Sequence, residues 1–506
     1  MQLVTPLEMM KLEDLANKSG VSYDQMMDAA GNGLAEHLTH FALEHSCNAI
    51  LFLCGNGNNG GDCFVAASKL SKQFSITVCL VSGVPKTRTA YTKYRLLKNV
   101  TILSEQDAIR AAVAEHQLIV DGVFGIGFRG ELSPFMREIF RTVNQDPDKN
   151  CIAVDIPSGG NGLNGAVAED TPHCIATITF GAAKSGLFLA PLSEHCGAIY
   201  LSEIDIPESA FQALTYPVMH ISSDFVREKL PNRPANSHKG NFGRILFVCG
   251  SRSMPGAAVL AVQAALRCGV GTCVLASEPD ACRNVIAHAP ESMLLPLPTD
   301  PDGYLTQQSA AAILKSAESA SCVVIGCGLG QTEGVRQLVL SLIPQLNCPI
   351  ILDADGLNVI ASRIDILQKA KVSVTLTPHP GEMARLLRCS VDEIQKDRLA
   401  AAKRLANRYP NTVVVLKGAG TIVAVSDHAS VNTNGNSGMS KGGSGDVLAG
   451  MIGSLTAQGI SPETAAEIGV FLHGLAGDCA AAEFSRRAML PSDLIRQLPL
   501  VFGDFE

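Results

Sequence analysis

The 506-residue sequence has no CxxC pair among its 16 cysteines, no excess of basic residues and no long apolar run. Without paired ligand spacing a cysteine metal site is disfavoured, and because most cysteines lie inside apolar runs we expect buried, reduced thiols. A helix that spans a bilayer needs about 20 apolar residues, so no membrane segment is expected. The net charge of −8 disfavours binding to nucleic acid or anionic lipid. Residues 1–20 lack the layout of a signal peptide, which predicts a cytoplasmic protein.

Short apolar runs, each followed by a Gly-rich turn and a longer Ala- and Leu-rich helical pattern, repeat along the chain. The runs at 49–54 and 244–249 begin two such units. Because these strands are apolar throughout and do not alternate, the pattern predicts parallel sheets with helices on both faces. Further strands of this kind are predicted at 117–123, 151–157, 174–180, 198–207, 322–326, 349–355, 373–378 and 412–418.

A change of pattern separates two domains. Residues 208–237 carry Pro217, Pro231 and Pro234 and show no clear alternation of strand and helix, and a new strand–loop–helix unit begins after them. The length of the chain also favours more than one domain. The sequence therefore predicts an α/β fold with an N-terminal domain at 1–210 and a C-terminal domain at 225–506.

The segment NGNNGGD (56–62) joins a predicted strand to a predicted helix. Its glycines allow backbone amides to approach a ligand, and the start of a helix adds partial positive charge, a combination that suits a phosphate. Asn58, Asn59 and Asp62 would add polar contacts that a plain turn does not need. An Asn/Gly turn with an N-cap is the structural alternative. The segment is neither a Walker loop nor a dinucleotide fingerprint.

Two aspartates close predicted strands beside Gly-rich loops. Asp121 precedes residues 122–130, and Asp155 precedes the segment IPSG at 156–159. In open parallel sheets, ligands bind outside the carboxyl ends of the strands, so these loops and Asn59 are expected to converge. One carboxylate can serve as a base, and oxygens of Asn, Asp and Ser158 can hold a hard cation. Capping roles for the aspartates remain the alternative.

The second half contains SKGGSGD (440–446) directly before a helical pattern. The amides of Gly442, Gly443, Ser444 and Gly445 would form an anion hole at the start of that helix. Asp446 would lie in its first turn, where a phosphate arrives, and a base at an anion hole is what phosphoryl transfer to a hydroxyl needs. An acidic residue that only complements the helix dipole is the alternative.

Three other strand ends in the second half carry polar residues. His379 lies between two prolines and is interpreted as a ligand contact, although a structural histidine is the commoner case. Lys417 ends a strand before a Gly-rich turn suited to phosphate or ribose. Asp353 and Asp355 end another strand, where a capping role is as plausible as a functional one.

Three motifs of the first half occur together and in order: NGNNGGD, VDGVFGIGFRG (120–130) and VDIPSG (154–159). They resemble the YjeF N-terminal domain family of NAD(P)H-hydrate epimerases. The resemblance implies a Rossmann-like three-layer sandwich, a potassium ion held by Asn59, Asp121 and Ser158, and Asp155 as acid/base and substrate contact. Cys63 departs from the family, which usually has Gly after NNGGD. The other residues that would line the substrate are Asn58, Asn59, Gly60, Gly61, Asp62, Gly125, Ile126, Gly127, Phe128, Arg129, Gly130 and Glu131.

The second half carries HKGNFGRILFVCGS, MPGAA, LDADGLN, TPHPGEMARL, LKGAGT and KGGSGDVLAG in that order. These motifs resemble the ribokinase-like enzymes and, more closely, the YjeF C-terminal domain, an ADP- or ATP-dependent dehydratase of the S form of NAD(P)H hydrate. The resemblance implies that Ala257, Gly328, His379 and Asp446 contact the hydrate. It implies that the nucleotide is bound by Lys417, Gly418, Ala419, Gly420, Thr421 and Gly445.

The chain as a whole thus resembles the fused, bifunctional form of this family. The resemblance implies NADHX and NADPHX as substrates, ADP or ATP as co-substrate, potassium and magnesium as cofactors, and a homo-oligomer. Phosphorylation of the ring hydroxyl by the nucleotide would create a good leaving group, with Asp446 as the catalytic base and Asp155 as the catalytic residue of the first domain.

Three rival functions remain open from the sequence. A small-molecule kinase would share GGSGD and would release a stable phosphorylated product. The first half could be a binding module, although Asn59, Asp121, Asp155 and Ser158 are all present. A redox enzyme is disfavoured because no convincing GxGxxG with an acidic partner occurs.

Overall fold

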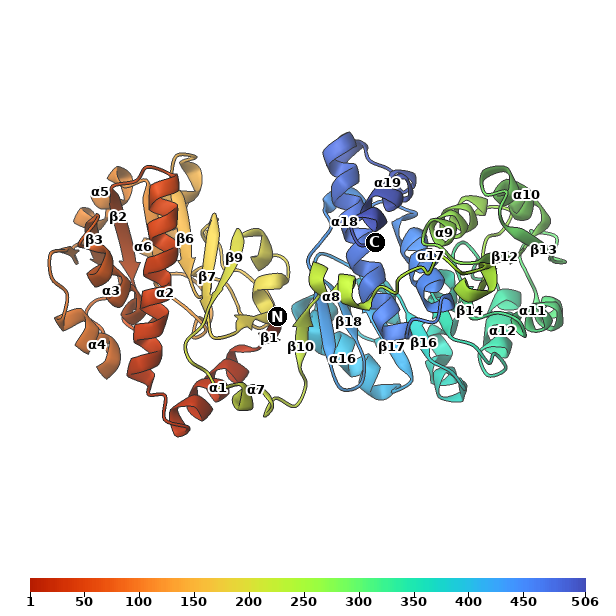
Figure 1. Cartoon of the computed structure of the whole chain (residues 1–506), viewed down its shortest axis with the longest axis horizontal. Coiled ribbons are helices and arrows are strands. Elements are labelled where there is room, and N and C mark those ends of the chain that lie inside the picture. The colour runs from red at the N-terminus through yellow and green to blue at the C-terminus, as the bar shows by residue number, and fades with distance from the viewer. The chain divides into compact units, whose positions relative to one another are not determined.

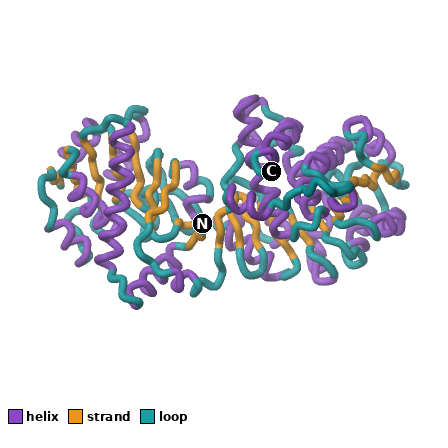
Figure 2. The backbone as a smooth tube through the Cα atoms, in the orientation of Figure 1, coloured by secondary structure: helices purple, strands orange, loops and turns teal.

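The computed structural model describes all 506 residues, and their contacts divide the chain into two units, Met1–Val218 and Met219–Glu506 (Figures 1 and 2). Each unit has its own sheet with helices on its faces. The short strand β10 (Val218–His220) spans the boundary.

Seven parallel strands form the sheet of the first unit, in the order β4-β3-β2-β5-β6-β7-β9. A short parallel pair, outside these seven strands, joins β1 (Gln2–Val4) to β8 (Ala183–Lys184). The strands of the sheet are β2 (Ala49–Cys54), β3 (Ser75–Leu80), β4 (Thr101–Leu103), β5 (Leu118–Gly122), β6 (Asn150–Val154), β7 (Ala176–Phe180) and β9 (Ala198–Ser202).

Apolar residues on both faces of this sheet explain why helices cover both. In β2, Ile50 and Phe52 pack with α1, α2 and α3, whereas Leu51 and Leu53 pack with α5 and α6. The predicted three-layer sandwich is confirmed. The helices are α1 (Pro6–Lys18), α2 (Tyr23–Glu44), α3 (Asn58–Leu70), α4 (Arg88–Arg95), α5 (Gln106–Glu115), α6 (Pro134–Gln145) and α7 (Glu208–Phe211).

The second unit is built on a mixed sheet whose strands follow the order β13-β12-β11-β14-β15-β16-β17-β18-β19. Neighbours from β13 to β17 are parallel, and β18 and β19 add antiparallel strands at one end. The strands are β11 (Arg244–Val248), β12 (Thr272–Ser277), β13 (Met293–Pro296), β14 (Cys322–Ile325), β15 (Ile350–Leu352), β16 (Val374–Leu376), β17 (Thr412–Leu416), β18 (Thr421–Ala424) and β19 (Ala429–Asn432).

The helix α17 lies at the centre of this unit. Its residues Met451 and Leu455 pack with Ile245 and Phe247 of β11, and α9 lies beside it. The helices are α8 (Ser223–Lys229), α9 (Pro255–Arg267), α10 (Pro279–His288), α11 (Ala310–Ala317), α12 (Glu333–Leu342), α13 (Asp355–Ile360), α14 (Pro380–Leu387), α15 (Val391–Lys396), α16 (Arg398–Arg408), α17 (Ser444–Ala457), α18 (Pro462–Ala488) and α19 (Pro491–Gly503).

Every strand predicted from an apolar run is present, and most are shorter than predicted. The run at 198–207 ends as a strand at Ser202, and Asp205 has a φ of +59°, which a strand cannot accommodate. The run at 349–355 ends at Leu352 because Ala354 has a φ of +46°. Hydrophobicity therefore located the strands, and the backbone turns that carry polar side chains ended them.

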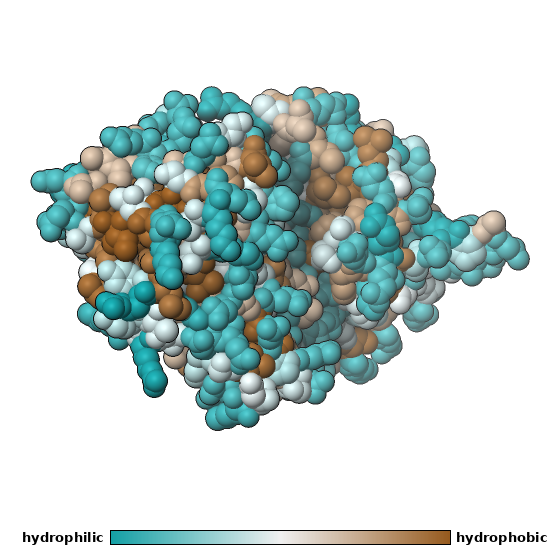
Figure 3. Space-filling view, turned by 60° about the vertical axis from the view of Figure 1, so that its left-hand side comes forward, coloured by the Kyte–Doolittle hydropathy of each residue, from teal (hydrophilic) through white to brown (hydrophobic).

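The face of the molecule in Figure 3 is mostly hydrophilic, with apolar residues gathered in a few patches. None of the helices combines the length and the apolar character needed to cross a bilayer. All 16 cysteines are free thiols, and only Cys389 and Cys479 are not fully buried, which confirms the predicted burial.

Candidate active sites

The first candidate site lies at the carboxyl ends of β2, β5 and β6, where the loop after β2 enters α3. The N-cap of α3 is Gly57, and no side chain caps the helix. The structural alternative, an Asn/Gly turn with an N-cap, is therefore present in part: Gly57 supplies the N-cap, but no Asn or Asp side chain caps the helix. The glycines are needed because backbone passes very close: a Cβ on Gly55 would lie 2.0 Å from the carbonyl oxygen of Val123, and one on Gly60 would lie 2.2 Å from that of Gly55.

Three loops converge on Gly125. The Nδ2 of Asn59 donates to the carbonyl oxygen of Val154 at 3.2 Å, which fixes the orientation of the amide. A Cβ on Gly125 would lie 3.1 Å from the Oδ1 of Asn59 and 3.2 Å from the Oδ2 of Asp155. The amide oxygen and one carboxylate oxygen thus face the same glycine, as the strand-end argument predicts.

Asp121 and Ser158 form a buried link between two of these loops. The backbone N–H of Ser158 donates to Asp121 Oδ2 at 2.7 Å, and its hydroxyl donates to Oδ1 at 2.6 Å. The N–H of Phe124 donates to the Ser158 hydroxyl at 2.9 Å. Burial raises the pKa of Asp121 to about 6, against the hydrogen bonds from Ser158. Together with Asn59, these residues supply only oxygen donors, a set that fits a hard cation such as potassium.

Asp155 is held in a strained and specific position. Its φ is +68°, and only 7% of its surface is exposed. Its Oδ1 accepts hydrogen bonds from Lys184 Nζ at 2.6 Å and Thr179 Oγ1 at 3.0 Å. Lys184 also donates to Thr179 Oγ1 and to the carbonyl oxygen of Phe180. Oδ1 is therefore occupied, while Oδ2 faces Gly125.

Two further carboxyl groups interact electrostatically with this ion pair. Burial, followed by the negative charges of Asp155 and Glu13, raises the pKa of Asp62 well above its usual range. Burial also raises the pKa of Glu13, which the charge of Lys184 opposes and that of Asp155 reinforces.

The glycine-rich segment Gly125–Glu131 follows Phe124 and includes exposed residues from Gly127 onwards, apart from Phe128, whose ring centroid lies 5.1 Å from that of Phe124. Cys63, which departs from the family pattern, is fully buried. Its side chain points to the interior, because a Cβ on Gly122 would lie 2.0 Å from its Sγ. The cysteine therefore packs in the interior, beside Gly122 at the end of β5.

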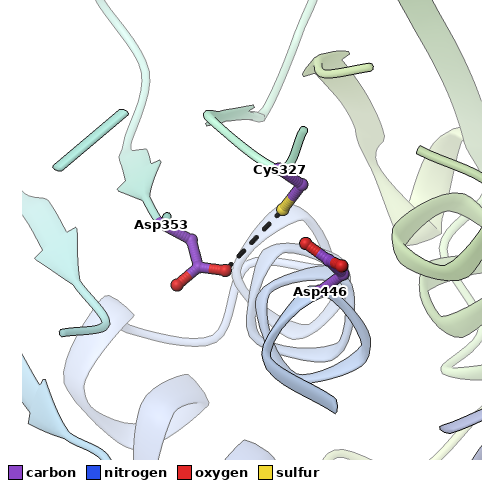
Figure 4. A group of neighbouring side chains, drawn as sticks. All are labelled: Cys327, Asp353 and Asp446. Carbon is purple, nitrogen blue, oxygen red and sulfur yellow. Dashed lines mark hydrogen bonds between the residues drawn. The ribbon is translucent and has the colours of Figure 1, made fainter. Parts of the chain in front are cut away.

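The second candidate site lies at the start of α17. Gly443, with a φ of +107°, is its N-cap, and Asp446 lies in its first turn. Asp446 lies near Asp353 and Cys327 (Figure 4). A carboxylate oxygen of each aspartate and the Sγ of Cys327 all lie within 4.8 Å of one another. Burial and the negative charge of Asp353 raise the pKa of Asp446 to about 7, while Cys327 and Lys417 oppose the shift. At neutral pH this carboxyl group can both accept and donate a proton.

Lys417 points inward and pairs with Asp353. Its Nζ donates to Asp353 Oδ1 at 2.8 Å, and Thr377 Oγ1 donates to the same oxygen at 2.7 Å. Burial opposes charge on both partners, but their mutual attraction lowers the pKa of Asp353 and raises that of Lys417. A Cβ on Gly445 would lie 3.1 Å from Lys417 Nζ, so the ammonium group faces the start of α17. Within the Cys327–Asp353–Asp446 group, the carboxylate of Asp353 is therefore already paired with the ammonium group of Lys417.

The remaining predicted residues have the following places. His379 is the N-cap of α14: its Nδ1 accepts hydrogen bonds from the N–H groups of Gly381 and Glu382, and about half of the side chain is exposed. The histidine therefore has a structural role, and its Nε2 lies 3.5 Å from Glu382 Oε1. Gly328 adjoins Ala257, because a Cβ on Gly328 would lie 2.8 Å from that of Ala257. Asp355 accepts hydrogen bonds from Gly330 and Gln331 and, like Asp353, caps no helix through its side chain.

Four residues that hold these sites together were missed from the sequence. Lys184 and Thr179 hold Asp155, and a lysine shortly after the predicted strand at 174–180 was the available signal. His473 accepts no proton near neutral pH, because burial lowers its pKa to about 4, and its Nε2 lies 3.0 Å from the carbonyl oxygen of Ser444. Arg398 contacts the loop of Lys417. Nothing in the local sequence marked His473 or Arg398.

Two family models match the chain, one within each of the two units. A family model described as NAD(P)H-hydrate dehydratase matches residues 245–500, and one described as YjeF-related protein N-terminus matches residues 23–186. The chain is 35% identical over 519 aligned residues to a bifunctional NAD(P)H-hydrate repair enzyme of Moorella thermoacetica, covering 100% of this chain and 97% of the relative. An Escherichia coli K12 enzyme of the same name is 35% identical over 459 residues, covering 88% and 84%.

Two solved structures each match 57% of the chain. A ribokinase-like superfamily protein from Enterococcus faecalis V583 has a TM-score of 0.50 and 26% identity, covering 57% of this chain and 96% of that chain. An ADP/ATP-dependent NAD(P)H-hydrate dehydratase from Bacillus subtilis, co-crystallised with ATP and Mg²⁺, has a TM-score of 0.48 and 35% identity, covering 57% and 99%.

Proposed function

Because the chain belongs to the family of bifunctional NAD(P)H-hydrate repair enzymes, in which an epimerase domain precedes an ADP/ATP-dependent dehydratase domain, we propose specific roles for the residues of its two sites. The first site would interconvert the R and S hydrates of NADH and NADPH. The second would return the S hydrate to the reduced cofactor. One observation carries the second assignment: Asp446, with a pKa of about 7, lies in the first turn of α17, with the ammonium group of Lys417 facing the start of that helix.

Asp155 is the proposed acid/base group of the epimerase. Inversion of the ring carbon that bears the hydroxyl group requires a bond at that carbon to break and re-form, and a proton must move at the hydroxyl group. The Oδ2 of Asp155 faces Gly125 on the substrate side, while Lys184 and Thr179 hold Oδ1. This division of the two oxygens would leave one of them free for proton transfer.

Asn59, Asp121 and Ser158 are the proposed potassium ligands. Their donor atoms are all oxygens, and the amide of Asn59 is fixed by its hydrogen bond to Val154. When bound, potassium would supply positive charge beside the substrate loops. Asp121 and Ser158 hold the loops after β5 and β6 together through their own hydrogen bonds.

Phosphoryl transfer followed by elimination is the proposed dehydratase chemistry. The ring hydroxyl oxygen would attack the terminal phosphorus of the nucleotide, its proton would pass to Asp446, and the bond from phosphorus to the nucleotide would break. Loss of phosphate from the ring and of a proton from the adjacent carbon would then restore NAD(P)H. The amides of Gly442, Gly443 and Gly445 would hold the transferring phosphoryl charge, whereas the N–H of Ser444 already donates to the carbonyl oxygen of Lys441 at 3.3 Å. Magnesium commonly neutralises nucleotide phosphates in such reactions.

The Asp446→Asn variant tests this assignment. Purified wild type and variant receive S hydrate, magnesium and either ADP or ATP, and absorbance at 340 nm reports reduced nicotinamide. The proposal predicts recovery with release of free phosphate for wild type and no recovery for the variant. A stable phosphorylated product would instead favour a small-molecule kinase.

The proposed homo-oligomer is a separate prediction, which analytical ultracentrifugation of the purified chain tests.

A further inference from the structure

Arg398, the first residue of α16, is buried against the loop that connects β17 to β18. Only 6% of its surface is exposed. Its guanidinium group donates to the carbonyl oxygens of Leu416 at 3.2 Å, Lys417 at 3.1 Å and Ala419. A Cβ on Gly418 would lie 2.7 Å from its Nη2. One side chain therefore holds most of the loop.

No carboxylate neutralises this guanidinium group. It takes part in no salt bridge, and the preceding Asp397 is used as the N-cap of α16, where its Oδ1 accepts from the N–H of Ala400 at 2.9 Å. The Nε of Arg398 is buried without a partner. A buried charge that is satisfied by carbonyl oxygens alone is costly, and an anion bound nearby would reduce that cost.

The three carbonyl contacts also determine where the amides of the loop point. In a trans peptide the C=O of one residue and the N–H of the next point in opposite directions. Because the carbonyl groups of Leu416, Lys417 and Ala419 face Arg398, the N–H groups of Lys417, Gly418 and Gly420 face away from it. The N–H of Lys417 donates to the carbonyl oxygen of Pro378. Those of Gly418 and Gly420 have no backbone acceptor.

We propose that Arg398 is a positioning residue for the nucleotide of the dehydratase site. It turns the amides of Gly418 and Gly420 outward as donors for the nucleotide, and its uncompensated charge favours an anionic ligand at this loop. The inference rests on the proposed function, which places ADP or ATP at residues 417–421. Arg398 itself touches neither substrate nor the reacting atoms.

Kinetics of the full-length Arg398→Gln variant test the proposal. With S hydrate held constant, we expect the KM for ADP or ATP to rise about tenfold or more, as for loss of charged hydrogen bonds, while kcat changes much less. Arg398→Lys retains the charge and is expected to recover part of the affinity. Arg404→Gln, an exposed arginine of the same helix, is the matched control and should behave as wild type.

Nucleotide-induced shifts of the melting temperature separate this inference from the proposed function. The inference predicts that ADP or ATP stabilises wild type and stabilises Arg398→Gln less, with circular dichroism unchanged. An equal shift and an equal KM in both proteins would overturn the inference and leave the dehydratase assignment standing. A proportional loss of kcat without a change in KM, unrelieved by lysine, would show a purely structural role. Absence of any nucleotide effect on wild type would refute the proposed nucleotide site and the inference with it.

Discussion

The pH dependence of the dehydratase reaction should report the ionisation of Asp446. A general base works only when it is deprotonated, and burial together with the charge of Asp353 raises the pKa of this group to about 7. We therefore expect kcat to rise about tenfold per pH unit below about pH 7 and to level off above it. The assay is initial recovery of absorbance at 340 nm with saturating S hydrate and nucleotide.

The Asp446→Asn variant should lose about 10²- to 10⁴-fold of the rate, the usual contribution of a general base. Asp392→Asn is the matched control, because Asp392 also lies in the first turn of a helix, α15, but is exposed. A flat profile between about pH 5.5 and 8.5, or an Asp446→Asn variant with more than about a tenth of wild-type activity, would refute the role of Asp446 as base.

The same raised pKa predicts an opposite effect on stability. Because the folded-state pKa of Asp446 lies above its usual value, the ionised carboxylate destabilises the fold, and this penalty grows as pH rises from about 4 to 7. Asp446→Asn should therefore raise the melting temperature at about pH 8 and have a smaller effect at about pH 5. A variant less stable than wild type at pH 8 would contradict the assigned environment.

Three further changes test other parts of the structure. Lys184→Met should destabilise the first unit by about 3–5 kcal/mol in chemical denaturation and suppress epimerisation, because it leaves the carboxylate of Asp155 buried and unpaired. Adding Asp155→Asn to this variant should restore most of the stability but no activity. Ser158→Ala should weaken the dependence of the epimerisation rate on potassium concentration; an unchanged potassium titration would remove this residue from the ligand set. Gly443→Ala should lower the free energy of unfolding by about 1–2 kcal/mol in thermal melts and reduce dehydratase turnover, because the φ of Gly443 is +107° and the new Cβ would lie 2.6 Å from Leu260 Cδ1. A fully stable and active variant would contradict the tight turn before α17.

Much of the fold followed from the sequence because its strands are buried on both faces. An unbroken run such as AILFLC at 49–54 identifies such a strand without reference to the rest of the chain. The loops at the strand ends were likewise local, since Gly and Asn or Asp mark backbone turns directly. The strand ends that carry Asn59, Asp121 and Asp155 were therefore expected to converge, and the structure brings their loops together.

The partners of the site residues could not be predicted in the same way. Lys417 pairs with Asp353 across 64 residues of sequence, and Asp155 with Lys184 across 29, so tertiary packing alone decides these contacts. His379 was expected to contact a ligand, and its side chain also caps α14, a role that needs the helix boundary to be known. The roles assigned by resemblance to the remaining loop residues stay predictions.

The most direct test of the account is recovery of the 340 nm band from a mixture of R and S NADPH hydrate, with potassium, magnesium and ADP or ATP. The account predicts complete recovery by wild type, faster than spontaneous epimerisation allows. It predicts rapid recovery of only the S fraction by Asp155→Asn and none by Asp446→Asn. Complete recovery by either variant, or no recovery by wild type with either nucleotide, would contradict the central claim that these two aspartates carry the two halves of the repair reaction.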